Sequence, residues 1–187
     1  MRRIYIKAAN AALCDSLSQA LEELDAQIIC CCDDQPPSGA ELSAVDAVMI
    51  STPLKNEFGL NYVTQARKLT SACMIVLAKT DIADEVQSRI KFTGAYVLPR
   101  PFSKAALVQT VKMALLANES MQRLEEEKSQ LTKQLDDVKT IDRAKCCLIE
   151  YLGMTEAQAH KHIQKLAMDT RRPQREIAED ILRTYLI

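Results

Sequence analysis

The sequence predicts an α/β chain in which a five-stranded, doubly wound parallel sheet is followed by one long helix and a small helical unit. From residue 2 to about residue 116, short apolar runs alternate with stretches of helical period, a pattern typical of parallel βα repeats. Neither Gly nor Pro interrupts residues 104–152. Beyond that stretch, a capping box and a proline mark the starts of two further helices.

The strands are expected where short apolar runs occur, over residues 3–6, 27–32, 47–50, 73–77 and 96–98. The third run is apolar throughout, which predicts burial on both faces. Between the first two strands, leucines recur at spacings of four, four and three, predicting a helix with Asn10 as its N-cap. A short helical segment follows the turn at 33–39, and another helix is expected from about residue 82 to 92, ending at Gly94.

The long helix begins after Ser103, a suitable N-cap, and carries a short heptad pattern. The apolar a and d positions are Met121, Leu124, Leu131, Leu135 and Val138, with Lys128 at the intervening a position. This pattern predicts a parallel coiled coil and therefore a homodimer. The alternative is a lone charged helix folded back on the first domain.

The C-terminal unit is predicted to hold three helices. Gly153 ends the long helix, and Thr155 with Gln158 forms a capping box that starts a second helix to about Thr170. Pro173 starts the third. The expected core of this unit is Ile141, Leu148, Leu152, Ile163, Leu166, Met168, Ile177 and Ile181.

The composition excludes a disordered or strongly basic chain. Among 187 residues, 24 are Lys or Arg and 25 are Asp or Glu, while 48% are hydrophobic. No apolar run approaches the roughly 18–20 residues of a membrane span, and the first residues lack a signal-peptide core, so a cytoplasmic protein is expected. Seven cysteines without a C-x-x-C motif indicate reduced, mostly buried thiols. His160 and His162 point apart on a helix, so neither metal nor cofactor is expected.

Residues 1–118 resemble the receiver domain of two-component response regulators, since five strands alternate with helices and Arg100-Pro101-Phe102 follows the fifth. The resemblance implies an acidic pair after the first strand, an acceptor Asp after the third, a hydroxyl after the fourth and a Lys before Pro-Phe. The residues present at these places are Ala8, Ala9, Ser51, Ala78 and Arg100.

This departure predicts a pseudo-receiver, because phosphoryl transfer to aspartate needs a divalent cation held by oxygen ligands. The acids Asp33, Asp34 and Asp46 are expected to lie away from that place. Phosphorylation of Ser51 by a kinase, and a phosphorylation-dependent response regulator, are the alternatives. No enzymatic activity is expected.

Four blocks over about residues 135–184 resemble the ANTAR domain in order and spacing: Ile141-Asp142-Arg143-Ala144-Lys145, Met154 to Ala159, Lys165 to Asp169, and Glu176 to Ile181. The resemblance implies an RNA-binding antiterminator that holds a two-hairpin leader transcript. Cys146, His160 and Gln174 depart from the family pattern. Cations suit phosphates and flat or amide groups suit loop bases, so the predicted RNA contacts are Arg143, Lys145, His160, Lys161, Gln164, Lys165, Arg171 and Arg172.

The resulting hypothesis divides the chain into a pseudo-receiver at 1–118, a coiled-coil linker at 119–137 and an ANTAR unit at 138–187. The net charge of −1 combines 0 for residues 1–118, −3 for 119–137 and +2 for 139–187. Control is expected from a regulatory protein partner rather than from phosphate. An adaptor that no longer binds RNA is the alternative, whereas a helix-turn-helix DNA reader is disfavoured by Glu176, Glu179 and Asp180 on its would-be recognition helix.

Overall fold

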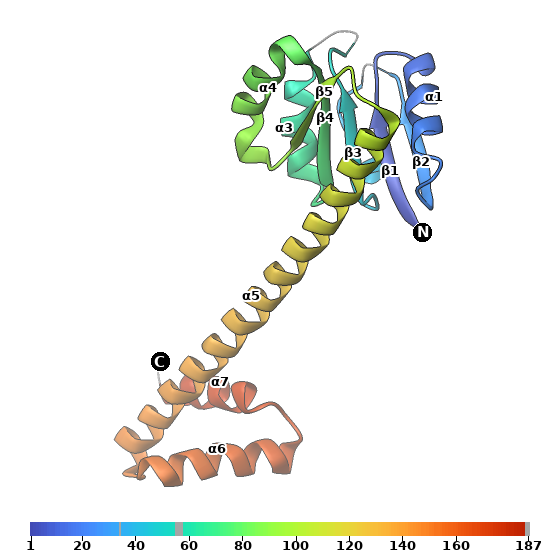
Figure 1. Cartoon of the computed structure of the whole chain (residues 1–187). Helices are drawn as coiled ribbons and strands as arrows, with labels where there is room; N and C mark the ends of the chain where they lie inside the picture. Colours follow the sequence, from blue (N-terminus) through green and yellow to red (C-terminus); the bar gives the residue numbers. More distant parts are fainter. Residues whose placement is uncertain (34, 55–57, 186–187) are drawn as a thin grey trace. The chain divides into compact units, whose positions relative to one another are not determined.

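The computed structural model describes residues 1–33, 35–54 and 58–185, and the chain forms two compact units, Met1–Met121 and Gln122–Ile187 (Figure 1). We describe each unit by itself. The expected boundaries after residues 118 and 137 stay a prediction.

The first unit is built on a parallel five-stranded sheet, as the sequence predicts. Its strand order is β2-β1-β3-β4-β5. The strands are β1 (Arg2–Lys7), β2 (Ala26–Cys31), β3 (Ala47–Ser51), β4 (Cys73–Lys79) and β5 (Tyr96–Arg100). The last two strands are longer than the predicted runs at 73–77 and 96–98. The ladder between them continues beyond those runs, pairing Ala78 with Pro99 and Lys79 with Arg100.

Helices cover both faces of this sheet (Figure 1). One face packs against α1 (Ala11–Ala20) and the first turns of α5 (Lys104–Leu152), while the other packs against α2 (Gly39–Leu42), α3 (Leu60–Leu69) and α4 (Ala83–Ile90). Alternation along β1 divides the core, since Ile4 and Ile6 join the first cluster and Tyr5 joins the second. All five residues of β3 are buried, as its continuous hydrophobicity predicts.

Local signals place several element ends correctly. The Asn10 side chain accepts a hydrogen bond from the Leu13 amide at 2.9 Å, and Ser103 accepts one from the Ala106 amide at 3.1 Å. The helix predicted over residues 82–92 is instead α4 flanked by two short 3-10 turns, η1 (Thr80–Ile82) and η2 (Lys91–Thr93). Gly94 follows with φ +68°, a conformation that favours glycine. Sequence patterning did not delimit α3.

The second unit comprises the rest of α5 with α6 (Glu156–Thr170) and α7 (Gln174–Tyr185). Gly153 ends α5 with φ +65°. The predicted capping box is present, because Thr155 accepts from the Gln158 amide at 3.3 Å and Gln158 accepts from the Thr155 amide at 2.8 Å. Arg171 ends α6 with φ +54°, a left-handed conformation.

The core of the second unit uses smaller side chains than predicted. Leu148, Ile163, Ile177 and Ile181 are buried as expected, but they pack among Ala144, Ala159, Ala167, Ala178 and Cys147. The prediction was wrong for Leu152 and Met168, which are 49% and 73% exposed. Alanines on the buried faces bring the helices together, and Met168 lies on the opposite face of α6 from Ile163.

The cysteines are all free thiols, but the expectation that most are buried was wrong. Cys14, Cys73 and Cys147 are buried, whereas Cys30 and Cys146 are exposed and Cys31 and Cys32 are half-buried. Among the described residues, no helix is long and apolar enough to cross a membrane. Within the same ranges, no group of three or more His, Cys, Asp or Glu side chains is placed to hold a metal ion.

Candidate functional site

The carboxyl ends of the parallel strands bring several predicted residues of the degenerate acceptor site to one edge of the sheet. Ser51 ends β3 and is fully buried, and Arg100 ends β5. The Arg100 Nη1 lies 3.3 Å from Ser51 Oγ, and its Nη2 donates to the Thr52 carbonyl. Ala8 and Ala78 are buried and Ala9 is half-buried, so small apolar groups stand where the receiver pattern has oxygen ligands and a hydroxyl.

The Arg100 guanidinium is therefore the hydrogen-bond partner of the Ser51 hydroxyl. This hydroxyl accepts the guanidinium hydrogen bond at a position without solvent exposure. A protein kinase needs a hydroxyl that it can reach from solvent. Ser51 instead ends β3, the central strand of the sheet, and is fully buried. The local geometry disfavours the alternative in which Ser51 is phosphorylated.

Sequence reasoning missed Lys7, a second cation at this edge besides Arg100. Its side chain is only 3% exposed, and its Nζ lies 2.6 Å from Asp33 Oδ1, 3.3 Å from the Gln35 carbonyl oxygen and 3.4 Å from Cys31 Sγ. The expectation that Asp33 lies away from this edge was wrong, because β2 is the direct neighbour of β1. A lysine directly after the apolar run predicted as the first strand was the available signal.

The surroundings of this ion pair shift several pKa values. Burial opposes the charged form of Lys7, but the hydrogen bond to Asp33, with Tyr62 and Cys31 nearby, keeps the pKa of Lys7 above its usual value. The hydrogen bond from Lys7 lowers the pKa of Asp33. Burial raises the pKa of Tyr5, whose hydroxyl accepts a hydrogen bond from Tyr62 at 3.3 Å. The ammonium thus stays charged although its side chain is almost fully buried.

In the second unit, four predicted RNA-contacting residues form one exposed face of α6. His160, Lys161, Gln164 and Lys165 are exposed, whereas Ala159, Ile163 and Ala167 line the opposite, buried face. Lys161, Lys165 and Met168 follow at spacings of four and three, so the exposed methionine lies beside the two lysines. The face combines cations, an amide, an imidazole and an apolar group.

The six basic residues among the predicted RNA contacts fall into two groups. In the first group, acids neutralise the cation: Lys145 contacts Asp142 at 2.8 Å and Glu156 at 3.2 Å, and Arg172 contacts Glu176 at 2.9 Å and Asp180 at 2.8 Å. In the second group, no ion pair is formed with any residue of the described ranges; its members are Arg143, Lys161, Lys165 and Arg171.

The ion pairs of the first group have consequences for the predicted contacts. The hydrogen bonds that Lys145 donates to Asp142 and Glu156 raise the pKa of Lys145, and those that Arg172 donates to Glu176 and Asp180 raise the pKa of Arg172. Both side chains must give up acidic partners before they can bind a phosphate. The members of the second group are exposed to solvent, and three of them lie on α6 or at its end.

Arg175 joins α7 to α5, a role that sequence reasoning did not assign. Its guanidinium contacts Asp136 at 2.8 Å and Glu179 at 3.0 Å, and also binds Asp137. The hydrogen bonds to these acids, led by Asp137, raise the pKa of Arg175 well above its usual value. Arg175 therefore links α7 to α5 through ion pairs at the edge of their packed faces.

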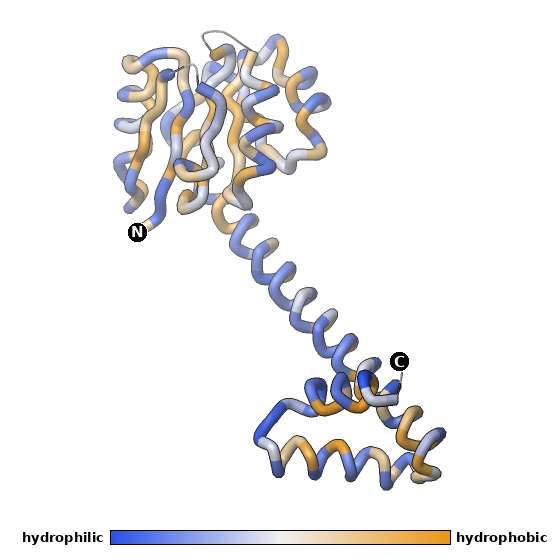
Figure 2. Tube along the Cα trace, turned by 180° about the vertical axis from the view of Figure 1, so that it is seen from behind, coloured by the Kyte–Doolittle hydropathy of each residue, from blue (hydrophilic) through white to orange (hydrophobic). Residues whose placement is uncertain are grey.

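The predicted heptad positions form an exposed apolar row on α5. Met121, Leu124, Leu131, Leu135 and Val138 expose 55–62% of their surface in the single chain. Figure 2 shows that the neighbouring residues along the middle of this helix are mostly hydrophilic. Such a row on a charged helix matches the seam of a coiled coil.

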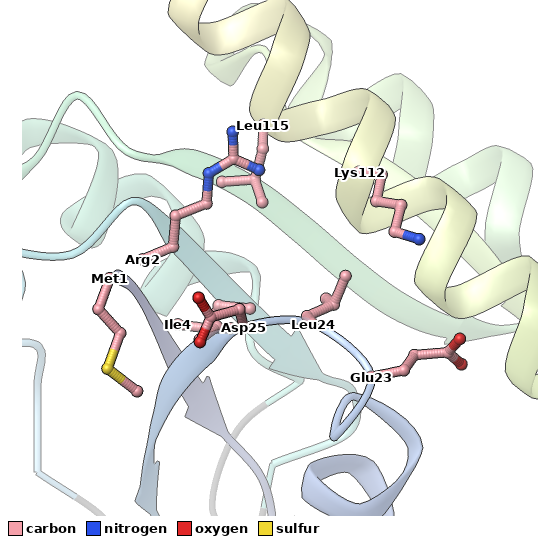
Figure 3. Close-up of a pocket in the computed structure, with 9 residues that line it drawn as sticks. Met1, Arg2, Ile4, Glu23, Leu24, Asp25, Lys112 and Leu115 are labelled. Atoms are coloured by element: carbon pink, nitrogen blue, oxygen red, sulfur yellow. The ribbon is translucent and has the colours of Figure 1, made fainter.

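A cavity of about 390 Å³ lies at the opposite edge of the sheet, where β1 and β2 begin (Figure 3). Its lining includes Arg2, Glu23, Asp25 and Lys112 together with apolar side chains. Arg2 also pairs with Glu119 at 2.6 Å and Glu23 with Lys104 at 3.6 Å. Charges of both signs line this cavity, and no predicted site residue belongs to it.

Comparisons with known proteins found a family match for the second unit and a relative that aligns with nearly the whole chain. Residues 129–182 match the ANTAR domain family. The chain is 30% identical over 186 residues to the transcriptional regulatory protein PdtaR of Mycobacterium tuberculosis (strain H37Rv), an alignment that covers 98% of this chain and 90% of that protein.

Solved structures are similar to the first unit. A CheY-like response regulator receiver domain protein from Methanospirillum hungatei JF-1 has a TM-score of 0.54 at 19% identity, covering 65% of this chain and 98% of that one. The chemotaxis protein CheY4 of Vibrio cholerae has a TM-score of 0.52 at 17% identity, covering 61% and 98%. At these identities the likeness shows the fold alone.

Proposed function

Because this chain belongs to the family of ANTAR-domain response regulators, we propose that it is a transcription antitermination regulator that binds hairpin loops in a nascent leader RNA. The observation that carries the proposal is the exposed face of α6. There Lys161 and Lys165 carry no acidic partner among the described residues, and His160 and Gln164 lie beside them. Lysines bind phosphates, while imidazole and amide groups stack on or read unpaired loop bases.

The proposal places control outside phosphorylation. Ser51 is buried beneath Arg100, Ala8 and Ala78 provide no oxygen ligand through their side chains, and the ammonium of Lys7 is already paired with Asp33. A regulatory protein partner that sequesters or releases the chain is the form of control that fits this edge.

A homodimer is part of the proposal. Pairing along the heptad row on α5 would bury side chains that are now more than half exposed. Two ANTAR units in one dimer could each hold one hairpin, so that the second contact forms at a high effective concentration. Modest contacts at each loop are then sufficient.

The second candidate function is a protein-interaction adaptor whose ANTAR unit no longer binds RNA. Two observations favour it. Lys145 and Arg172, both predicted RNA contacts, are paired with acids. In addition, Cys146, His160 and Gln174 depart from the family pattern.

A titration distinguishes the two. The purified full chain is added to a labelled RNA of two short hairpins joined by a single strand, at several salt concentrations, and anisotropy is read. Antitermination predicts binding that weakens with salt, and Lys161→Ala with Lys165→Ala should reduce the salt slope by about 1–2, because each phosphate contact contributes roughly 0.7–0.9.

The matched control is Arg123→Ala with Lys133→Ala, which removes two exposed cations from α5 outside the proposed face and off the a and d positions of the heptad row. This control should leave RNA affinity nearly unchanged. Equal losses in both double variants would indicate general charge attraction, and absence of binding at low salt would favour the adaptor.

A further inference from the structure

Three consecutive cysteines at the end of β2 face two different sides of the sheet. Cys32 packs against the core shared by α1 and α5, whereas Cys31 packs against the core on the other face and contacts Lys7. Cys30, two positions before Cys32, lies on the α1 side, where its Sγ is 3.3 Å from Ser18 Oγ. Strand alternation therefore brings two thiols of the run toward α1.

On the α1 side, Cys14 meets Cys32. The two Sγ atoms are 3.1 Å apart, although the residues are separated by 18 positions. Cys14 is buried, and Cys32 is half-buried. A disulfide has an S–S distance of about 2.05 Å, so bond formation requires the two sulfurs to approach by roughly 1 Å.

We propose that Cys14 and Cys32 form a redox-active dithiol, which a hydroperoxide oxidises to a disulfide linking α1 to the end of β2. Neither residue is one of the predicted residues of the degenerate acceptor site, the heptad row or the proposed RNA face. The pair is a modification site of the receiver-like unit and is independent of the proposed RNA binding.

The difference in exposure sets the order of the two chemical steps. The half-buried Cys32 loses its proton to solvent, and its sulfur attacks hydrogen peroxide. An S–O bond forms, the O–O bond breaks, and the hydroxide released takes up a proton to become water. Cys32 is then a sulfenic acid.

Cys14 completes the reaction. Its sulfur attacks the sulfenic sulfur of Cys32, so that the S–S bond forms and the S–O bond breaks. The departing hydroxide takes the Cys14 proton and leaves as a second water. Burial and the neighbouring thiols of Cys32 and Cys30 raise the pKa of Cys14, which agrees with Cys14 reacting second, as a thiol that loses its proton only in this step.

Peptide mapping of the oxidised full chain tests this proposal. The protein is treated with hydrogen peroxide, remaining thiols are alkylated under denaturing conditions, and the chain is cleaved after glutamate. Cys14 then lies in a fragment that ends at Glu22 or Glu23, and Cys30 to Cys32 lie in a fragment that ends at Glu41. We expect these fragments joined, with a mass two hydrogen atoms below their sum, and separated by reduction.

The cysteine run supplies a matched control. Cys32→Ser should abolish the link, whereas Cys31→Ser, on the opposite side of the same chain segment, should retain it. Circular dichroism of both variants verifies that each is folded. A link that persists in Cys32→Ser, or oxidation that yields only sulfinic acid or intermolecular bridges in the original chain, would overturn the proposal.

Discussion

The Nζ of Lys7, at the end of β1, lies 2.6 Å from Oδ1 of Asp33, which follows β2. The Lys7 side chain is almost fully buried, whereas the Asp33 side chain is 52% exposed. Receiver domains, which the first unit resembles, rely at this edge on a cation that binds and leaves. Here the chain itself places two cations at this edge, Lys7 and Arg100.

We predict that Asp33→Asn lowers the free energy of unfolding at pH 7. The replacement leaves the buried ammonium without its anionic partner, and we expect a loss of about 2 kcal/mol, below the 3–5 kcal/mol of a fully buried pair because Asp33 is half exposed. Lys7 lowers the pKa of Asp33, so its contribution is present at neutral pH and lost as the pH falls below about 4 toward the lowered value. Urea denaturation at several pH values measures both effects.

The background variant Lys7→Met is the control for this prediction. With the ammonium removed, Asp33→Asn should change the unfolding free energy by only a few tenths of a kcal/mol, which gives a coupling energy in a double-mutant cycle. If Asp33→Asn costs the same in both backgrounds, Asp33 acts through the backbone of the turn and the ion pair is not responsible.

A second prediction concerns the core of the second unit. Ile163 is fully buried and Met168 is 73% exposed, although both were expected in the core. We predict that Ile163→Ala lowers the unfolding free energy by about 2–5 kcal/mol, because it leaves a cavity between α6 and its neighbours, whereas Met168→Ala changes it by less than about 0.5 kcal/mol. Chemical denaturation of both variants, followed by helical circular dichroism, tests the contrast. A large loss for Met168→Ala would mean that this side chain is covered.

A third prediction concerns the heptad row. Leu131→Lys with Leu135→Lys should weaken a dimer by more than about 100-fold, because each buried leucine contributes roughly 1.5–3 kcal/mol to such a seam. Sedimentation equilibrium measures the change, and Gln130→Lys, an exposed residue off the a and d positions, is the control. A chain that is monomeric at all concentrations before substitution would refute the coiled coil.

The sequence predicts the fold where local chemistry and periodicity coincide. Asn10, Ser103 and the Thr155 capping box mark helix starts correctly, because caps depend on neighbours within four residues. The burial of Met168 was predicted wrongly, because alanines on several helices, distant in sequence, decide how closely the helices of the unit approach one another.

In the candidate sites, too, some features follow from the sequence pattern and others depend on packing between distant segments. The carboxyl ends of parallel strands converge by topology, so the places of Ser51 and Arg100 on one edge follow from strand order. Lys7 with Asp33 joins β1 to the segment after β2, and Cys14 with Cys32 joins α1 to the same segment. Both distances depend on the packing of β2 beside β1 and α1. Nothing in the spacing of these residues indicates such contacts.

The final prediction concerns which cations reach an RNA. Arg172 is held by Glu176 and Asp180, whereas Lys165 has no acidic partner among the described residues. We therefore predict that Lys165→Ala weakens binding to the two-hairpin RNA several-fold more than Arg172→Ala does. Glu176→Gln with Asp180→Asn should strengthen it, because removing two acids frees the guanidinium and reduces repulsion of phosphates.

Adding Arg172→Ala to the Glu176→Gln and Asp180→Asn variant separates these two causes. If release of the guanidinium carries the gain, Arg172→Ala should remove most of it. If the gain survives, lower phosphate repulsion alone explains it, and Arg172 is not a latent contact. Anisotropy titrations at two salt concentrations provide the comparison, since a new phosphate contact steepens the dependence of log K on log salt by about 0.7–0.9, whereas a gain in affinity without a new phosphate contact leaves this slope nearly unchanged.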